Sequence, residues 1–432
     1  MTRKDTDRLA DVARLLAEYE KAPTKADEFF ETKFALYFKY KEERQVCQFI
    51  FLTVLRNKLL IEFILKRLLL RKTRPLLKAL IQCGCAEIIA SPAAKRPQII
   101  HAWVETCKQS FSVGESKVAN AVLRRFAENF DELSASAKSL DDFATLHSHP
   151  DWLAKSWGKN FGEEKALEIM KNNQRPSEVF FRISSSTSAK IAFAPFAQHF
   201  EKTADPCFFK MKGGRWQDVC ELLETPYAYV QDPSTGNAPR ALNPQPGEKI
   251  LDMCAAPGGK SRMLADLLLA SGQNLSDNLI VSIDLPGARF ERLSENLSKI
   301  DFVPIKTIAA DLLKNELPQK LQENGLPEKF DAILLDAPCS NTGVLRRRPD
   351  VRLRLKKSDI INCSKIQEEL IKTALTLLKP NGRLIYSTCS VEPEENIDAP
   401  TKALKNFPNF HISKSETIIP NESDGAGLCI IT

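Results

Sequence analysis

The sequence contains no uninterrupted apolar run of the length that a membrane span requires. Five charged side chains interrupt its most apolar stretch, residues 48–70: Arg56, Lys58, Glu62, Lys66 and Arg67. This pattern predicts amphipathic helices. The first residues, MTRKDTDRLADVARLLAEY, are charged throughout and lack the apolar core of a secretory signal. We therefore expect no membrane partner.

Metal-ligand spacing is also absent from the cysteines. None of the eleven belongs to a CxxC motif, and the close pair Cys83-x-Cys85 has no second half and falls in an apolar helical pattern. A zinc site would want further Cys or His ligands, so we expect no metal. An odd number of cysteines cannot all pair within one chain, and a long soluble chain is not a typical disulfide scaffold. The expected setting is the reducing cytoplasm.

Acidic residues are scarce in part of the N-terminal region. Residues 51–100 carry 10 basic side chains and 2 acidic ones, and residues 1–125 carry 24 Lys and Arg against 14 Asp and Glu, a surplus of 10. A local surplus of this size favours a polyanionic partner such as RNA. A solvated helix face would give the same pattern.

The chain divides into three regions by pattern. In residues 1–145 glycine is rare and Leu, Phe and Ile recur at three- and four-residue spacing, which predicts an all-helical domain. The composition shifts near His149-Pro150, and the mixed signals of residues 146–235 predict a small α/β linker region. The third region, residues 236–432, alternates between strand and helix patterns.

This alternation predicts a doubly wound α/β domain. Strands are expected at residues 248–253, 278–284, 305–310, 330–336 and 382–388. Helices are expected at residues 261–270, 288–300 and 358–378. Strands joined by crossover helices imply a mostly parallel sheet with helices on both faces.

A glycine-rich turn, LDMCAAPGGKS at residues 251–261, follows the first of these strands. Such a turn lets backbone N–H groups and a helix N-terminus face a ligand. A phosphate-binding loop fits the final GKS but requires a glycine where Cys254 stands. A dinucleotide-binding fold requires glycines at G-x-G-x-x-G spacing, whereas the two glycines of this turn are adjacent. S-adenosylmethionine, which has no phosphates but needs backbone room at the turn, is the third candidate.

Carboxylates follow the next three strands. Asp284 ends the second strand, where it could accept hydrogen bonds from ribose hydroxyls, and Asp311 follows the third strand, near the expected adenine. Asp336 ends the fourth strand. Each could instead cap a helix, but together they favour S-adenosylmethionine.

Two cysteines, Cys339 in DAPCSNTG and Cys389 in YSTCS, follow neighbouring strands and should flank one pocket. A thiol beside a methyl donor suits one reaction in particular, because C5 of cytosine accepts a methyl group readily only after a thiolate has added to C6. The pocket must then favour the thiolate, and Asp336 could bind the N3/N4 edge of the base. Cys389 could also be a redox thiol, a metal ligand or a small core residue, and chemistry alone does not choose between the two cysteines.

Between the cysteines lie five arginines within residues 346–354. Beside a pocket mouth they suit contacts with the phosphates of a nucleic acid, although a solvated loop would look the same. A base inside a duplex cannot be reached, so the target would be single-stranded or flipped out.

The motifs LDMCAAPGGKS, SIDLPGARFERLSENL, DAPCSNTGVLRRRPDVR and YSTCSVEPEEN resemble those of the RNA cytosine-5 methyltransferases. KVANAVLRR (117–125) and YVQDPSTGNAP (229–239) extend the resemblance to the bacterial 16S ribosomal RNA enzymes of the Sun/Fmu type. The resemblance implies a Rossmann-like class I methyltransferase domain with a seven-stranded sheet at 236–432. It also implies a NusB-like RNA-binding domain at 1–145, S-adenosylmethionine as cofactor and 16S ribosomal RNA as partner. We expect the protein to be a monomer.

Carried over residue by residue, the resemblance implies that Cys389 attacks C6 and that Cys339 assists product release. Binding of the cytosine edge by Asp336 remains a hypothesis from the chemistry. Cofactor contacts are implied for Cys254, Ala255, Ala256, Pro257, Gly258, Gly259, Lys260, Asp284, Asp311 and Asp336. RNA contacts are predicted for Arg124, Arg125, Arg346, Arg347, Arg348 and Arg352.

Three features depart from the family pattern. Asn341 replaces a glycine, Arg348 replaces a His or Asn, and the chain ends in DGAGLCIIT where relatives carry an aromatic-rich strand. The alternatives are a transfer RNA enzyme of the same chemistry, a non-catalytic RNA-binding assembly factor and a nucleotide-hydrolysing P-loop protein. The intact Asp336 and cysteine pair argue against the second of these alternatives, and Cys254 argues against the third.

Overall fold

The computed structural model describes residues 5–38, 41–212, 216–272, 275–314 and 316–432. Contacts divide the chain into two units, Met1–Pro176 with Leu345–Leu355, and Ser177–Val344 with Lys356–Thr432. The arginine-rich segment between the two candidate cysteines therefore folds with the first unit. The domain limits at residues 145 and 235 stay predictions.

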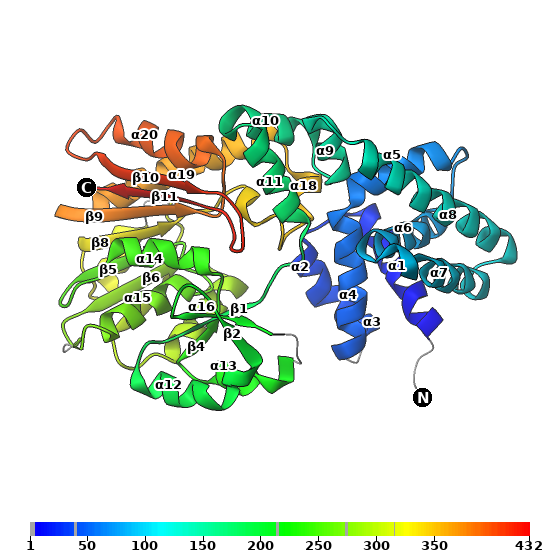
Figure 1. Ribbon diagram of the computed structural model, residues 1–432. Helices are drawn as coiled ribbons and strands as arrows, with labels where there is room; N and C mark the ends of the chain where they lie inside the picture. The colour runs from blue at the N-terminus through cyan, green and yellow to red at the C-terminus, as the bar shows by residue number, and fades with distance from the viewer. Residues whose placement is uncertain (1–4, 39–40, 213–215, 273–274, 315) are drawn as a thin grey trace. The chain divides into compact units, whose positions relative to one another are not determined.

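The first unit is helical, as predicted (Figure 1). Its longer helices are α1 (Asp5–Lys21), α4 (Lys41–Arg56), α5 (Lys58–Leu68), α6 (Pro75–Ala90), α7 (Arg96–Ser110), α8 (Val113–Ser136), α9 (Leu140–Leu146), α10 (Asp151–Phe161) and α11 (Glu163–Gln174). Short helices are α2 (Ala26–Phe29), α3 (Ala35–Tyr37) and α18 (Val351–Arg354). The apolar faces of α1, α2 and α4 to α8 share one core, in which the ring of Tyr19 meets Phe29 and Phe51 edge-on. None of the described helices is long and apolar enough to cross a membrane.

The second unit begins with a small antiparallel sheet in the order β2-β3-β1-β4. The strands are β1 (Phe180–Ile183), β2 (Phe200–Lys202), β3 (Phe208–Met211) and β4 (Ala228–Val230), with helices α12 (Thr187–Phe193) and α13 (Cys220–Glu224). These helices cover one face around Phe181. The other face meets helix α15 (Gly259–Leu269), where Arg262 donates to the carbonyl oxygen of Pro226 (2.7 Å) and stacks on Tyr229.

The larger sheet has seven strands in the order β10-β11-β9-β8-β5-β6-β7. They are β5 (Lys249–Met253), β6 (Leu279–Asp284), β7 (Ile305–Ala309), β8 (Phe330–Asp336), β9 (Leu378–Thr388), β10 (Ile412–Ile418) and β11 (Ala426–Ile431). The first five are parallel, and β11 and β10 continue the sheet antiparallel. The predicted doubly wound, mostly parallel sheet is confirmed, and the unusual chain end forms β11 beside β9.

Alternate residues of the parallel strands pack into separate cores on the two faces. On β5, Ile250 packs with helices α14 (Asn237–Leu242), α15 and α16 (Ala288–Ser298). Leu251, the next residue, packs on the opposite face with α17 (Leu317–Glu323), α19 (Lys357–Leu377) and α20 (Ala399–Leu404).

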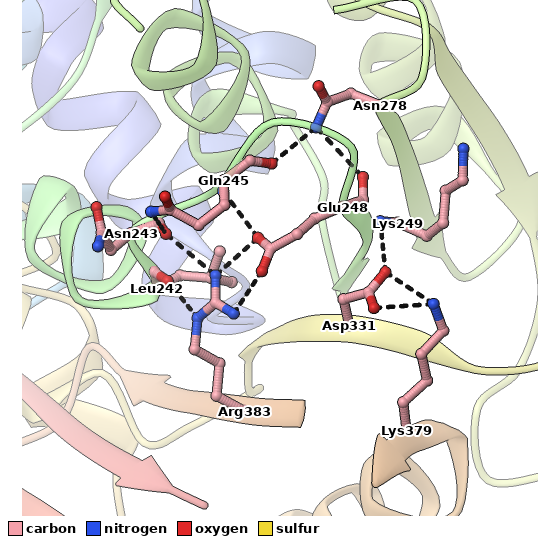
Figure 2. Close-up of polar contacts among 9 residues, drawn as sticks. All are labelled: Leu242, Asn243, Gln245, Glu248, Lys249, Asn278, Asp331, Lys379 and Arg383. Carbon is pink, nitrogen blue, oxygen red and sulfur yellow. Dashed lines mark hydrogen bonds and ion pairs between the residues drawn. The ribbon is translucent and has the colours of Figure 1, made fainter. Parts of the chain in front are cut away.

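A polar network fastens the edge of the sheet where β5 and β8 begin (Figure 2). Arg383 of β9 forms a bidentate pair with Glu248 (2.7 and 2.8 Å) and donates to the carbonyl oxygen of Leu242 (2.6 Å). Asp331 of β8 accepts from the backbone N–H of Lys249 (2.9 Å) and from Lys379 (2.8 Å). These contacts occupy the edge where the strands begin, so a ligand site is expected at the opposite edge, where the parallel strands end.

Candidate active site

The predicted site residues gather at the carboxyl ends of the parallel strands. The strand register aligns Met253 with Ile283, Asp284 with Ala309, and Asp336 with Ser387. The residues that follow each strand therefore meet along one edge, which is where open α/β sheets bind ligands.

The glycine-rich turn adopts a left-handed backbone at two positions, Cys254 (φ 59°) and Gly258 (φ 104°). Within the turn, the backbone N–H of Ala255 donates to the carbonyl oxygen of Ile283 (2.9 Å). At Gly259 a Cβ atom would lie 2.8 Å from the ring of Tyr229. Only glycine fits there, because β4 of the small sheet packs directly against the turn.

Two side chains of helix α16 hold the carbonyl oxygens of the same turn. Arg289 donates to the carbonyl oxygen of Ala256 (2.8 Å), and Asn296 donates to that of Pro257 (2.8 Å). Sequence reasoning missed both residues, because polar residues on an amphipathic helix are normally solvated. They fix a turn that has no regular structure of its own.

Asp284 ties the turn to strand β6. One carboxylate oxygen accepts from the backbone N–H of Ala256 (2.8 Å), and the other accepts from that of Leu285 (2.8 Å). Each oxygen keeps a lone pair for a ligand hydroxyl. Asp311 accepts from the backbone N–H of Leu313 (3.1 Å). Asp284 ends β6 and Asp311 follows β7, so the carboxylates predicted to bind the ribose and to lie near the adenine are both at this edge.

Large apolar side chains that are exposed to solvent flank these carboxylates. Leu285 is 55% exposed and Leu313 is 52% exposed, each within two residues of its carboxylate. Apolar side chains beside hydrogen-bond acceptors suit a ligand that has a flat aromatic base and a hydroxylated sugar. The residues present therefore fit the adenosyl part of S-adenosylmethionine.

Asp252 lies completely buried beneath the turn. One oxygen accepts from the hydroxyl of Ser261 (2.5 Å), and the other has no partner among the described residues. Burial raises the pKa of Asp252 to about 7, with the negative charge of Asp336 adding to the effect and Ser261 opposing it. This carboxyl therefore changes charge near neutral pH.

Lys260, in the first turn of α15, pairs with Asp336 at the end of β8 (2.5 Å). The other oxygen of Asp336 accepts from the hydroxyl of Ser387 (3.2 Å). Burial lowers the pKa of Lys260, but the attraction of Asp336, and to a smaller extent that of Cys389, outweighs it and raises the pKa. The ammonium stays charged and lies near enough to the Cys389 sulfur to interact with it.

The two predicted cysteines meet at this point. The sulfur atoms of Cys339 and Cys389 are 3.0 Å apart, well beyond the disulfide length of about 2.05 Å, and both residues are half-buried. The hydrogen bond to Cys389 and then burial raise the pKa of Cys339 well above its ordinary value. Cys339 therefore holds its proton more firmly than an ordinary cysteine does.

Asn341, which stands where the family has glycine, supports both cysteines. Its φ of 63° is left-handed, as a glycine's could be. Its side chain donates to the carbonyl oxygen of Cys339 (2.8 Å) and accepts from the thiol of Cys389 (3.1 Å). The departure keeps the loop conformation and adds a contact to each cysteine.

The remaining cysteines show no comparable arrangement. Burial raises the pKa of the Cys83 and Cys85 thiols well above their ordinary range. Burial also raises the pKa of the Cys254 thiol, which lies in the turn itself. In the part of the chain that the structure describes, no three His, Cys, Asp or Glu side chains converge in a way that could hold a metal.

Arg352 lies inside the first unit and does not face a nucleic acid. It is 1% exposed and donates to carbonyl oxygens of Arg56 (3.3 Å), His147 (3.3 Å) and Asn173 (2.9 Å). These carbonyls lie in the last turn of α4 and α11 or directly after α9, and the C-termini of helices carry partial negative charge. One guanidinium thus caps three helices, and the phosphate contact predicted for Arg352 does not fit this position.

The other predicted RNA-contacting arginines differ in exposure. Arg346 is buried, and Arg347 is half-buried. Arg348 is exposed and lies 3.3 Å from Asp27. Arg124 and Arg125 are exposed on α8. Only exposed guanidinium groups are placed to meet a phosphate as they stand.

A basic groove that sequence reasoning did not single out lies between α5 and α6. It encloses about 500 Å³ and is lined by Leu59, Glu62, Phe63, Leu65, Lys66, Leu69, Arg71, Lys72, Thr73 and Lys78. Lys78 is paired with Glu62 (2.8 Å). Lys66, Arg71 and Lys72 form no ion pair with the described residues and are exposed. These three exposed cations, which form no ion pair with the described residues, make the groove a candidate anion-binding surface.

The doubly wound sheet, the glycine-rich turn, the carboxylates at the strand ends and the neighbouring thiols define the class. The second unit is an S-adenosylmethionine-dependent methyltransferase. A model described as 16S rRNA methyltransferase RsmB/F matches residues 239–426, and the NusB family model matches residues 11–128.

Curated relatives identify the family within this class. Ribosomal RNA small subunit methyltransferase B of Vibrio cholerae is 30% identical over 306 residues, covering 70% of this chain and 67% of the relative. That of Photorhabdus laumondii is 30% identical over 321 residues, covering 71% and 70%. The probable enzyme of Bacillus subtilis is 28% identical over 372 residues, covering 82% and 78%. The chain belongs to the ribosomal RNA small subunit methyltransferase B family.

Solved structures agree on the fold. A methyltransferase homologue from Pyrococcus horikoshii is 26% identical, with a TM-score of 0.55 over 68% of this chain and 99% of that one. The structure of PH0851 is 20% identical, with a TM-score of 0.74 over 100% of this chain and 99% of that one. The second likeness concerns the fold alone.

Proposed function

We propose that this methyltransferase moves a methyl group from S-adenosylmethionine to C5 of a cytosine in 16S ribosomal RNA, through a transient bond between Cys389 and C6. The observation that carries the proposal is the 3.0 Å approach of the Cys339 and Cys389 sulfurs at neighbouring strand ends. The relatives named ribosomal RNA small subunit methyltransferase B support ribosomal RNA as the substrate. We place the enzyme in the cytoplasm as a monomer.

Cys389 is the proposed nucleophile. Cys389 first loses its thiol proton to solvent, and its thiolate then forms a bond to C6. The electron pair of the C5–C6 double bond moves to C4–C5, N3 takes a proton from solvent, and C5 becomes enamine-like. The ammonium of Lys260 is placed to stabilise negative charge on this sulfur before the addition. When bound, the cofactor supplies a methyl group that is electrophilic because it sits on a sulfonium.

Asp336 is the proposed partner of the base edge. Its two oxygens each accept one hydrogen bond or ion pair, from Lys260 and Ser387, and each retains a lone pair. Those lone pairs suit the N4–H and the protonated N3 of the adduct. The carboxylate would then hold the pyrimidine while offsetting the positive charge that develops on it.

Cys339 is proposed to take the C5 proton and so permit release. The largest cause that raises the pKa of its thiol is the hydrogen bond with Cys389. Once the Cys389 sulfur is bonded to C6, that hydrogen bond is lost and the pKa of Cys339 falls. Cys339 then releases its thiol proton to solvent more readily, and the resulting thiolate accepts the proton from C5. The C5–H electron pair reforms the C5–C6 double bond, and Cys389 leaves C6 as a thiolate, which restores the aromatic ring.

The first unit is proposed to bind the RNA strand. Residues 58–78 carry seven Lys and Arg against one acidic residue, and Lys66, Arg71 and Lys72 of the groove are uncommitted. Arg67 stacks on Phe63 (4.4 Å to the ring centroid) at the same place. Clustered cations beside an aromatic ring suit a single strand with accessible phosphates and bases.

Bisulfite sequencing of RNA tests the proposal. Ribosomal and transfer RNA from cells with and without this protein would be compared, together with unmodified 16S RNA treated with the purified enzyme and S-adenosylmethionine. We expect a cytosine of 16S RNA to resist bisulfite only when the enzyme is present. Protection confined to transfer RNA would reassign the substrate, and no protected cytosine would contradict the reaction.

A further inference from the structure

The carboxylate of Glu395 joins the two loops that carry the cysteines. One oxygen accepts from the backbone N–H of Ser340 (2.8 Å), and the other accepts from the hydroxyls of Ser340 and Ser390 (2.5 Å for Ser390). Ser340 directly follows Cys339, and Ser390 directly follows Cys389. One buried side chain therefore holds the neighbour of each thiol.

Further contacts bracket Cys339 from the other side. Gln367 of α19 donates to Glu395 (3.0 Å) and to the carbonyl oxygen of Pro338 (2.9 Å). Pro338 precedes Cys339 and Ser340 follows it, so the backbone on both sides of this cysteine is tied to Glu395, directly or through Gln367.

Cys389 is bracketed in the same way by the next residue, Asn396. Its side chain accepts from the hydroxyl of Thr388 (2.6 Å) and donates to the carbonyl oxygen of Ser390 (3.0 Å). Thr388 and Ser390 are the two neighbours of Cys389. Of the two neighbouring residues Glu395 and Asn396, Glu395 is the one that contacts both cysteine loops.

We infer that Glu395 is a positioning residue that sets the distance between the two active-site thiols by holding Ser340 and Ser390 on one carboxylate. The inference rests on the proposed function for its catalytic consequence, whereas its geometric content stands by itself. In the proposed reaction Cys389 must reach C6 while Cys339 reaches the proton on C5, so the two sulfurs must keep a fixed separation. A misplacement of about 1 Å can cost about 100-fold in rate.

The burial of Glu395 supports this role. Its side chain is fully buried, and burial raises its pKa, while the hydrogen bonds from Ser340 and Ser390 oppose the rise. Replacing a buried charged group by apolar residues of similar volume is often neutral or stabilising. A buried carboxylate that is satisfied on both oxygens is therefore better explained by the geometry it imposes than by stability.

The separation of the thiols can be measured without methyl transfer. Diamide, an azo oxidant, takes two electrons and two protons from a pair of thiols, which form a disulfide while diamide becomes the hydrazine. In the full-length protein, closure of Cys339 with Cys389 should be fast, because the sulfurs must approach by only about 1 Å to reach the disulfide length. The rate would be followed by mass spectrometry of the linked peptides.

The variants are Glu395→Ala and Glu395→Gln. Alanine removes every contact to both loops, so we expect closure at least tenfold slower and kcat lower by about 100-fold, with little change in KM for S-adenosylmethionine. Glutamine keeps an acceptor oxygen for the Ser340 N–H, and its amide N–H can donate to the two serine hydroxyls, so it should restore most of both rates. Asp331→Ala, at the opposite edge of the sheet (Figure 2), is the control and should close at the wild-type rate.

Each outcome decides the matter. Slow closure in Glu395→Ala with rescue by Glu395→Gln supports the inference even if the protein methylates no cytosine. Failure of the inference is therefore distinguishable from failure of the proposed function. A folded Glu395→Ala enzyme with wild-type closure and wild-type kcat overturns it. If that variant does not fold, Ser340→Ala and Ser390→Ala each remove one loop from the carboxylate. Both must then slow closure, and wild-type closure in both overturns the inference.

Discussion

Lys260 and Asp336 form an ion pair of 2.5 Å that links the cofactor turn to the end of the strand before Cys339. The same ammonium interacts with the Cys389 sulfur. A single cation therefore lies between the glycine-rich turn, the carboxylate proposed to bind the base edge and the proposed nucleophile. Its removal should disturb the reaction more than it disturbs the fold.

Lys260→Met tests this cation. We expect kcat to fall by about 100-fold, because a fixed positive charge beside a developing anion is typically worth that much. Binding of S-adenosylmethionine, measured by calorimetry, should weaken far less. Lys249→Met, which removes a lysine at the start of β5, is the matched control and should leave kcat unchanged. Equal losses in the two variants would contradict the role of Lys260.

The buried Asp252 predicts a pH-dependent stability. Its pKa is about 7 in the folded protein against 3.8 for the ordinary group. Below about pH 4 the carboxyl is protonated in both states. Between pH 4 and 7 the unfolded chain releases the proton while the folded protein keeps it, so the free energy of unfolding should fall as pH rises through this window. Asp252→Asn stays neutral and should remove this fall in urea unfolding of the enzyme.

A second carboxyl provides the control for that experiment. Burial raises the pKa of Asp331, but Lys379 and the Lys249 N–H outweigh it and lower the pKa. Asp331 therefore stabilises the fold above its unfolded pKa and loses that contribution as pH falls. Asp331→Asn should change the pH dependence in the opposite sense, and the same change in both variants would refute the assignment.

The basic groove predicts a defined salt dependence of RNA binding. The triple substitution Lys66→Glu, Arg71→Glu and Lys72→Glu should weaken binding of a single-stranded 16S fragment. Because each phosphate contact contributes about 0.7 to the slope of log K against log salt, the slope should shrink by about 2. At saturating RNA, kcat should be unchanged, since the groove is not placed in the reaction.

An equal change of charge elsewhere controls for net charge. Lys155, Lys159 and Lys165 are exposed lysines of α10 and α11. Their replacement by glutamate should lower the slope less than the groove triple. If both sets act alike, the groove is a general basic surface instead of a binding site.

Arg352 should prove structural. Arg352→Ala leaves the carbonyl ends of three helices without their shared donor, and we expect a loss of about 3 kcal/mol in the unfolding of the first unit. Arg354→Ala, two residues on and half-exposed, should cost less than about 1 kcal/mol. Thermal unfolding followed by circular dichroism measures both. An unaffected melting temperature in Arg352→Ala would show that the cap is dispensable.

Local patterns were sufficient for much of the fold. Strands β5 to β8 were predicted within one residue at either end, because buried parallel strands read as apolar runs between turn residues. The positions of the glycine-rich turn and of the two strand-end cysteines are predictable because each motif coincides with a strand end. The pairing of Cys339 with Cys389 followed from sheet order, although their 3.0 Å separation did not.

The missed features depend on contacts between residues distant in sequence. Arg352 reads as one of a run of exposed arginines, and nothing local shows that it caps three helices formed up to 296 residues earlier. Glu395 reads as part of an acidic run after YSTCS, yet it is fully buried between two loops. Strands β2 and β4 are only three residues long, which is too short for a two-residue period to be recognised.

The most direct measurement is the site of covalent attachment to RNA. Cys339→Ala enzyme would be incubated with S-adenosylmethionine and unmodified 16S RNA, digested with nuclease and protease, and analysed by mass spectrometry. We predict a stable adduct in which a methylated cytidine is bonded to the peptide that contains Cys389, and none in the Cys339→Ala, Cys389→Ala double variant. An adduct on any other residue, or methyl transfer by the Cys389→Ala enzyme at the wild-type rate, would contradict the account.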